Sequence, residues 1–251
     1  KFTYWSIIMN TIVIDLEFNQ ASDKATMNLE CPFEIIQIGA ISLDKNLDCI
    51  GVFDRLIKPQ IYKEINPYVG SLTGLKIEDF TEEETYRSVF YDFLAFLGHE
   101  DIVFCTWGTA DMKELFRNTS FYCLPLSKLP NKYINLQPYV SQYLHFPSKV
   151  SISLKDALKF LKIEDESNFH NAYYDAYYTS KIFQKVYNQD IEPQIYDPSP
   201  PPRIPQPKKL HLNHTKLFSQ FEKMMERELT SEEKETVRLA YLMGKTGQFL
   251  E

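Results

Sequence analysis

Short apolar runs and helical repeats alternate along the first two hundred residues, and they predict strands and helices in turn. Three strands are expected first, over Thr11–Phe18, Glu34–Leu43 and Gly51–Lys58. Ile102–Trp107 is nearly all apolar, which is typical of a strand buried on both faces. The other elements predicted in this region are a helix over Ala110–Asn118, a strand over Lys132–Leu136, and helices over Ser153–Leu161 and Asn171–Asn188.

One further helix is predicted to end before Gly98. Thr81 and Glu84 have the spacing of a capping box, and apolar residues then recur at helical intervals as far as Leu97. Three consecutive strands followed by strands that alternate with helices predict an α/β fold, with a mixed five-stranded sheet flanked by helices.

Proline content divides the chain. Seven of the 14 prolines lie between Asp190 and Leu210, so residues 191–210 are predicted to form an extended linker or a strap. Residues 211–251 are predicted to form two helices, the second opening with a capping box of Thr230 and Glu233. These helices are expected either to bind a protein partner or to pack on the first domain. The first domain is expected over residues 9–190, with Met9 as the native start.

The 251 residues have an ordinary globular composition, 44% apolar and 24% charged. The four cysteines form no Cys-x-x-Cys pair, which suits a reducing cytoplasm and argues against a zinc ribbon or a disulfide scaffold. The apolar stretch before Asp15 is too short for a membrane span, and no secretory signal is recognisable. The net charge of −7 argues against tight, sequence-independent duplex binding, which ordinarily uses a broad basic face.

Two carboxylates lie in the first predicted strand. Apolar residues alternate with Val13, Asp15 and Glu17, so both acids lie on one face of the strand. In a central strand two unpaired like charges would be strongly unfavourable, so a cation is expected between them. An edge strand with a solvated acidic face would also explain the pattern.

The last predicted helix of the first domain carries an acid on its apolar stripe. Asp175 lies three residues after Ala172 and next to Ala176, on the face that should pack against the sheet. These small alanines would let the helix approach closely, and His170 lies just before the helix, where it can lean over the same place. The alternatives are a surface histidine and a first-turn acid that interacts with the helix dipole. The whole stripe is Ala172, Ala176, Thr179, Phe183 and Val186.

A third acid, Asp111, follows the apolar strand and Trp107. It is expected in the first turn of a short helix at the carboxyl end of a strand, where ligands collect in open sheets. Taken alone, Asp111 fits an ordinary helix-start acid equally well.

In this order, the four acids and the histidine resemble the DEDDh exonuclease family of the ribonuclease H-like fold, over Asn10 to Asn188. The runs that carry the resemblance are Ile12-Val13-Ile14-Asp15-Leu16-Glu17-Phe18, Trp107-Gly108-Thr109-Ala110-Asp111 and His170-Asn171-Ala172-Tyr173-Tyr174-Asp175. The supporting runs are Glu34-Ile35-Ile36-Gln37-Ile38-Gly39-Ala40 and Ile65-Asn66-Pro67 with Leu72-Thr73-Gly74-Leu75.

The resemblance implies a metal-dependent 3′→5′ exonuclease that releases nucleoside 5′-monophosphates. Asp15 would bridge two divalent cations, Glu17 and Asp175 would complete one metal site, and Asp111 would support the other. Oxygen-only ligands favour Mg²⁺ or Mn²⁺. His170 would take the proton from the attacking water, a role that suits histidine.

The resemblance also implies contacts to the terminal nucleotide from Phe18, Leu72 and Thr73, with Trp107 as a stacking surface. Plain core packing is the alternative for Phe18, Leu72 and Trp107. The expected partners are single-stranded 3′ ends of RNA or DNA, with no membrane.

RNA is slightly favoured, because residues 105–111 and 153–158 are most similar to the ERI-like exoribonucleases. A competing hypothesis is a proofreading exonuclease of the polymerase III epsilon type, which also has a linker and a C-terminal partner-binding segment. A catalytically silent RNA-binding or scaffold protein is a third hypothesis, and the complete set of five residues speaks against it.

Overall fold

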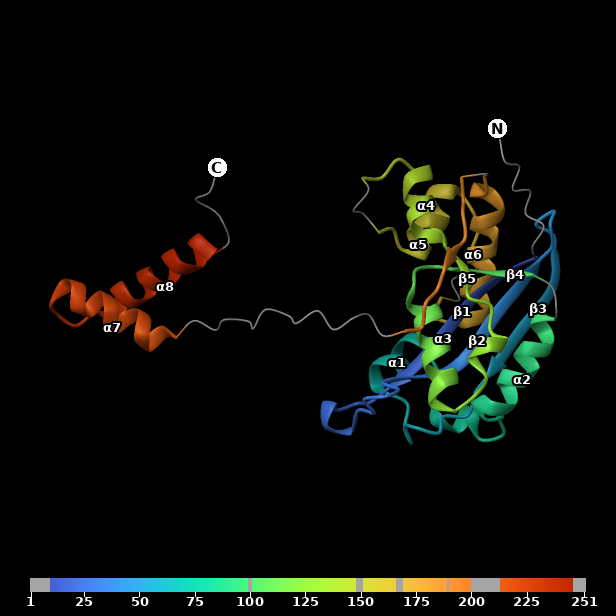
Figure 1. Ribbon diagram of the computed structural model, residues 1–251, viewed down its shortest axis with the longest axis horizontal. Coiled ribbons are helices and arrows are strands. Elements are labelled where there is room, and N and C mark those ends of the chain that lie inside the picture. Colours follow the sequence, from blue (N-terminus) through green and yellow to red (C-terminus); the bar gives the residue numbers. More distant parts are fainter. Residues whose placement is uncertain are drawn as a thin grey trace. The chain divides into compact units, whose positions relative to one another are not determined.

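The computed structural model describes residues 10–98, 101–147, 151–165, 169–188, 190–199 and 213–245. The chain divides into two compact units, with the boundary between Ser199 and Pro200. The first unit is built on a six-stranded sheet of order β3-β2-β1-β4-β5-β6 (Figure 1). The strands are β1 (Asn10–Gln20), β2 (Phe33–Leu43), β3 (Cys49–Leu56), β4 (Ile102–Thr106), β5 (Lys132–Asn135) and β6 (Gln194–Ile195).

The sheet is mixed, as the sequence predicts. The first three strands pair antiparallel, β4 and β5 add in parallel, and β6 pairs antiparallel with β5. The prediction of five strands is one short, because the two-residue β6 falls inside the segment assigned to the linker. The rest of the predicted linker, residues 200–210, and the predicted start at Met9 lie outside the described residues.

Helices cover both faces of the sheet, and α4, α5 and α6 gather together in Figure 1, apart from α2 and α3. The bounds are α1 (Pro67–Thr73), α2 (Tyr86–Leu97), α3 (Ala110–Phe121), α4 (Leu136–Tyr143), α5 (Leu154–Leu161) and α6 (Ala172–Val186). Short 3₁₀ turns complete the unit at η1 (Lys24–Thr26), η2 (Ile77–Phe80) and η3 (Leu126–Lys128).

Strand β1 decides which face carries the acids. Ile12, Ile14 and Leu16 pack in the core with α2 and α3, whereas Val13 packs in the core with α4, α5 and α6. Because side chains alternate along a strand, Asp15 and Glu17 continue the Val13 face, over which α6 lies. β1 is hydrogen-bonded to β2 and to β4, so the alternative of an edge strand is wrong.

The predicted capping box of Thr81 and Glu84 is also wrong. Helix α2 begins at Tyr86, and Thr85 precedes it in an extended conformation. Thr85 forms a parallel bridge with Lys58, whose backbone N–H donates to the Glu84 carbonyl over 2.8 Å. This tertiary pairing holds the chain extended where the local sequence would favour a helix start.

The second unit contains α7 (His214–Met225) and α8 (Ser231–Lys245). The predicted capping box at the start of α8 is confirmed: the Glu233 carboxylate accepts from the Thr230 backbone N–H over 2.9 Å, and the Thr230 hydroxyl accepts from the Glu233 N–H over 3.3 Å. Among the described residues, no helix has the length and apolar character that a membrane span requires.

Candidate active site

The two acids of β1 lie beside two residues of β2 that have a structural role in the site. In the antiparallel register, Asp15 is opposite Gly39 and Glu17 is opposite Gln37. A Cβ atom built on Gly39 would lie 2.1 Å from the carbonyl carbon of Ala172, at the start of α6. Only glycine therefore lets α6 cross β2 this closely, directly beside Asp15.

Gln37 links three elements at the same crossing. Its side chain is buried, its Oε1 accepts from the Ala172 N–H over 3.1 Å, and its Nε2 donates to Asp54 Oδ1 over 2.8 Å. The first backbone N–H groups of a helix have no intrahelical acceptor, so Gln37 supplies one and thereby fixes the start of α6 on the sheet.

The start of α6 positions Asp175 and His170. The Asn171 side chain caps the helix by accepting from two backbone N–H groups, and His170 before it has a left-handed backbone with φ of 63°. The His170 N–H donates to Asp175 Oδ2 over 3.2 Å. The other oxygen, Asp175 Oδ1, is buried and has no hydrogen-bond partner among the described residues.

Three of the predicted residues converge at this point. Glu17, His170 and Asp175 each offer a ligand atom, and the three atoms lie within 4.8 Å of one another. Glu17 and Asp175 are half-buried, whereas His170 is exposed at the rim. The cluster therefore opens to solvent on the histidine side.

Asp111 enters the same site from the end of β4. Asn135 on β5 accepts from the Gly108 N–H over 3.1 Å, and the Thr106 hydroxyl donates to the Gly108 carbonyl over 2.6 Å. This turn places Asp111 in the first turn of α3, where it is buried and its carboxylate accepts from the backbone of Leu16. The hydrogen bond to β1 brings a third element to the site.

Burial raises the pKa of all four carboxyl groups, and repulsion from neighbouring acids raises it further in three of them. Burial raises the pKa of Asp15 well above its ordinary value, and Asp111, Asp175 and Glu17 raise it further. The pKa of Glu17 rises to about 8, by burial and then by repulsion from Asp175 and Asp111. The pKa of Asp111 rises to about 7, by burial and, to a smaller extent, by Asp175. Burial raises that of Asp175 to about 6, although His170 opposes the rise.

The donor set fits divalent cations. One of the four carboxylates has a buried oxygen that lacks a hydrogen-bond partner among the described residues, and Asp15 is repelled by the other three. Together with the His170 imidazole at the rim, they form a mainly oxygen-lined pocket in need of positive charge. Hard cations such as Mg²⁺ and Mn²⁺ prefer such ligands, and Asp15, Glu17, Asp111 and Asp175 are the residues that could hold them.

The four residues predicted to contact substrate lie in different surroundings. Phe18 is half-buried and makes an edge contact with Phe33, their ring centroids 6.4 Å apart. Leu72 on α1 is exposed, and the hydroxyl of Thr73 donates to the Val69 carbonyl over 3.0 Å. Phe18, Leu72 and Thr73 thus belong to the core or to α1. The indole N–H of the fourth residue, Trp107, is buried without a hydrogen-bond partner among the described residues.

No local pattern in the sequence assigns a role to Gln37 or Gly39. The signal that the sequence offers is an amide within the otherwise apolar run from Ile35 to Ala40, followed two residues later by a glycine. Neither residue carries the chemistry of the site, but both determine where Asp175 lies.

The sequence matches the exonuclease family named RNase_T over residues 12–183. Similar solved structures include the nuclease domain of 3′hExo, a DEDDh family member, bound to rAMP, with 19% identity over 78% of this chain and 99% of that chain, TM-score 0.64. A 3′-exonuclease in a study of histone mRNA stem-loop recognition has 18% identity over 77% of this chain and 87% of that one, TM-score 0.63.

Exonuclease I of E. coli in complex with a dA16 oligonucleotide is similar over 70% of this chain and 40% of its own length, with 15% identity and a TM-score of 0.56. No curated protein matches the sequence. The family match spans well over half of the chain, and the structures share its fold. The chain belongs to the exonuclease family and has the ribonuclease H-like fold of the DEDDh 3′-exonucleases.

Proposed function

We propose that this exonuclease removes nucleotides from single-stranded 3′ ends with two divalent cations, Mg²⁺ or Mn²⁺, and that it releases nucleoside 5′-monophosphates. The observation that carries the proposal is the convergence of Asp15, Glu17, Asp111 and Asp175. Burial raises the pKa of all four, and repulsion from the neighbouring acids raises it further in all but Asp175. When bound, a pair of cations neutralises these carboxylates and stabilises the charge that develops on the phosphodiester.

His170 is proposed as the general base. It lies at the solvent side of the cluster, within 4.8 Å of the oxygens of Glu17 and Asp175, where the attacking water has to enter. Its backbone N–H donates a hydrogen bond to Asp175, which fixes the position of His170 beside the carboxylates although its side chain is exposed. A base at this place takes the water proton and returns it to solvent.

RNA is the proposed preference, although DNA uses the same chemistry. Among the similar structures, one concerns a histone mRNA stem-loop and another binds rAMP, whereas E. coli exonuclease I is in complex with DNA. The net charge of −7 supports a short contact with the terminal nucleotides. A cytoplasmic location is also proposed, because all four cysteines are free thiols.

Phe18, Leu72, Thr73 and Trp107 stay candidates for contacts to the terminal nucleotide. The exposed side chain of Leu72 supports a surface contact. The hydroxyl of Thr73 is already engaged within α1. Substituting Leu72 by alanine should therefore raise the Michaelis constant more than it lowers the turnover number.

The experiment is degradation of end-labelled RNA and DNA, single-stranded and double-stranded, with Mg²⁺, Mn²⁺ or EDTA. We expect metal-dependent shortening from the 3′ end, fastest on single-stranded RNA, and nearly complete loss of activity in Asp175→Asn. The matched control is Asp165→Asn, an exposed acid between α5 and α6. Binding of RNA without metal-dependent release of nucleotides would instead support the silent scaffold protein, and a preference for mispaired DNA ends would support the proofreading enzyme.

A further inference from the structure

The C-terminal helices α7 and α8 form a hairpin whose loop end is fixed by polar contacts. Arg227 donates two hydrogen bonds to the Glu233 carboxylate, of 2.8 and 2.6 Å. Glu222 accepts from the Leu229 N–H over 3.2 Å and lies 3.5 Å from the Lys234 ammonium nitrogen. These contacts hold the two helices together at one end through surface groups.

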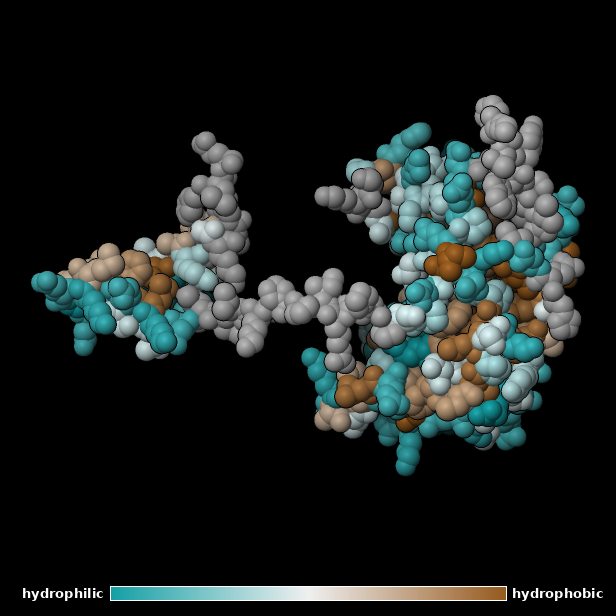
Figure 2. Space-filling view, viewed as in Figure 1, coloured by the Kyte–Doolittle hydropathy of each residue, from teal (hydrophilic) through white to brown (hydrophobic). Residues whose placement is uncertain are grey.

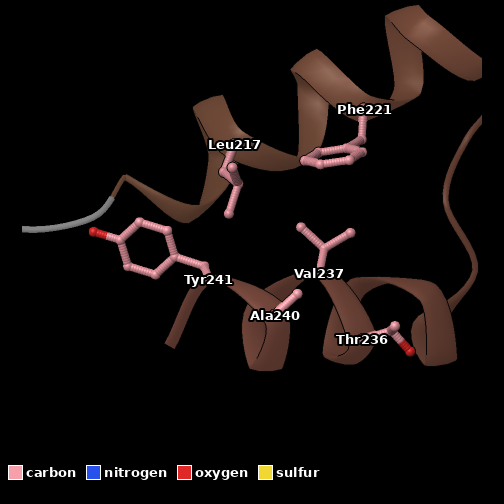
Figure 3. A pocket seen from close by; sticks show the side chains of 6 residues that line it. All are labelled: Leu217, Phe221, Thr236, Val237, Ala240 and Tyr241. Carbon is pink, nitrogen blue, oxygen red and sulfur yellow. The ribbon is translucent and has the colours of Figure 1, made fainter. Parts of the chain in front are cut away.

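The apolar side of the hairpin is open. Leu217 and Phe221 on α7 face Val237, Ala240 and Tyr241 on α8 across a groove of ≈ 410 Å³ (Figure 3). Figure 2 shows apolar residues gathered on the hairpin beside a strongly hydrophilic side. Of the hairpin side chains that the structure describes, only that of Leu229 is fully buried, and Met224 and Leu239 are 72% and 58% exposed.

A hairpin of this size needs something to cover its groove. Isolated units below ~40 residues ordinarily depend on a disulfide, a metal or association, because they bury too little apolar surface. All four cysteines lie before residue 124, so no disulfide can fasten α7 to α8. The described hairpin residues also contain no cluster of metal-binding side chains. Burial against another protein surface, that of a second copy or of this chain's own first domain, is the remaining way to cover the groove.

Charge is segregated along the hairpin. The loop end, residues 222–235, holds six glutamates and three basic residues, a net charge of −3. The open end, residues 213–221 and 236–245, holds Lys216, Arg238 and Lys245 and no acidic residue, a net charge of +3. Two such hairpins side by side in the same direction would repel, whereas two in opposite directions would pair acidic loop with basic open end.

We propose that the hairpin is a dimerisation module, and that the occupant of its groove is the hairpin of a second copy of this chain, placed antiparallel across a twofold axis. The product is a four-helix bundle with an isologous interface, in which each loop end meets the partner's open end. This proposal does not depend on the nuclease mechanism.

The size of the hairpin determines the affinity expected for the dimer. Helices α7 and α8 have 12 and 15 residues, so the shared face is about 20 Å long at 1.5 Å per residue. A face of this length is at the small end of specific interfaces, and a dissociation constant on the order of 1–50 μM is expected.

The test is sedimentation equilibrium of the full chain from ~1 to ~200 μM, in EDTA and without nucleic acid, a range that brackets the expected constant. We expect a reversible monomer–dimer equilibrium. Phe221→Glu places a charge in the groove and should raise the dissociation constant at least tenfold. Gln220→Ala, at an exposed neighbour on the same helix, leaves the charge of the open end unchanged and should change the constant less than twofold.

Charge reversal tests the antiparallel arrangement without disturbing the groove. Lys216 at the open end and Glu228 at the loop end form no ion pair within the described residues. Lys216→Glu and Glu228→Lys should each weaken the dimer several-fold, and the double variant should restore it. Circular dichroism confirms that each variant keeps its helix content. A protein that stays monomeric over the whole concentration range, including one whose hairpin packs on its own nuclease domain, would overturn the proposal. A dimer that either single charge reversal strengthens would also overturn it.

Discussion

Glu17 should make the metal-free protein less stable as the pH rises. Its pKa rises from an ordinary value of 4.5 to about 8, chiefly through burial and then through Asp175 and Asp111. A raised pKa means that the folded protein holds this proton more tightly than the unfolded chain does. The associated stability is fully present below about pH 4.5 and is lost as the pH rises through about 8.

The magnitude follows from the shift. One pKa unit corresponds to ~1.4 kcal/mol, so an ionised Glu17 destabilises the metal-free fold by at most about 5 kcal/mol above pH 8. The repulsion is shared with neighbouring acids and the side chain is half-buried, so we expect Glu17→Gln to raise the free energy of unfolding by about 2–4 kcal/mol at pH 8. At pH 4.5 the variant and the wild type should be equally stable.

The assay is urea unfolding followed by circular dichroism between pH 4.5 and 8.5, in EDTA and in Mg²⁺. Divalent cations should stabilise the wild type by about 2.7 kcal/mol at a hundredfold excess over the dissociation constant, and Glu17→Gln by less. Glu82→Gln, on the exposed segment before α2, is the control and should change stability by less than ~0.5 kcal/mol. A difference between Glu17→Gln and the wild type that does not vary with pH would refute this reasoning.

Three further variants test other parts of the site. Gly39→Ala should destabilise the fold by roughly 3 kcal/mol or more, because the added methyl group would overlap the backbone of Ala172. The control Gly51→Ala meets chiefly the side chain of Phe96, which can move, and should cost about 1 kcal/mol. Equal shifts of the two variants in thermal unfolding would contradict this. Gln37→Leu removes the acceptor of the Ala172 N–H at the start of α6 and should lower the free energy of unfolding in urea by about 1–3 kcal/mol. It should also lower the turnover number more than it raises the Michaelis constant. An unchanged turnover number would exclude a positioning role for Gln37. His170→Ala should lower turnover roughly 10²–10⁴-fold while calorimetry shows unchanged Mg²⁺ affinity, and loss of affinity would make His170 a ligand.

Much of the candidate site follows from local periodicity. Alternation along β1 placed Asp15 and Glu17 on one face, and the helical stripe placed Asp175 on the face of α6 that meets the sheet. Both inferences need only the geometry of one element. The order of the motifs along the chain then supplied the family, and the comparisons confirmed it.

The remaining features depend on contacts between distant segments. Because Lys58 and Thr85 form a bridge, α2 begins later than the predicted capping box of Thr81 and Glu84. Likewise, β6 exists because Ile195, in a proline-rich segment, pairs with Lys132 of β5. The roles of Gln37 and Gly39 require knowing where a helix far along the sequence crosses β2. No local pattern contains that information.

The site takes its carboxylates from both ends of the nuclease domain, since β1 contributes two and α6 the last one. Chains emerge from the ribosome with the N-terminal end first and fold as domains become available. A nascent chain therefore exposes Asp15 and Glu17 long before Asp175 and His170 exist. Until translation of the domain is complete, the growing polypeptide therefore lacks part of the candidate site.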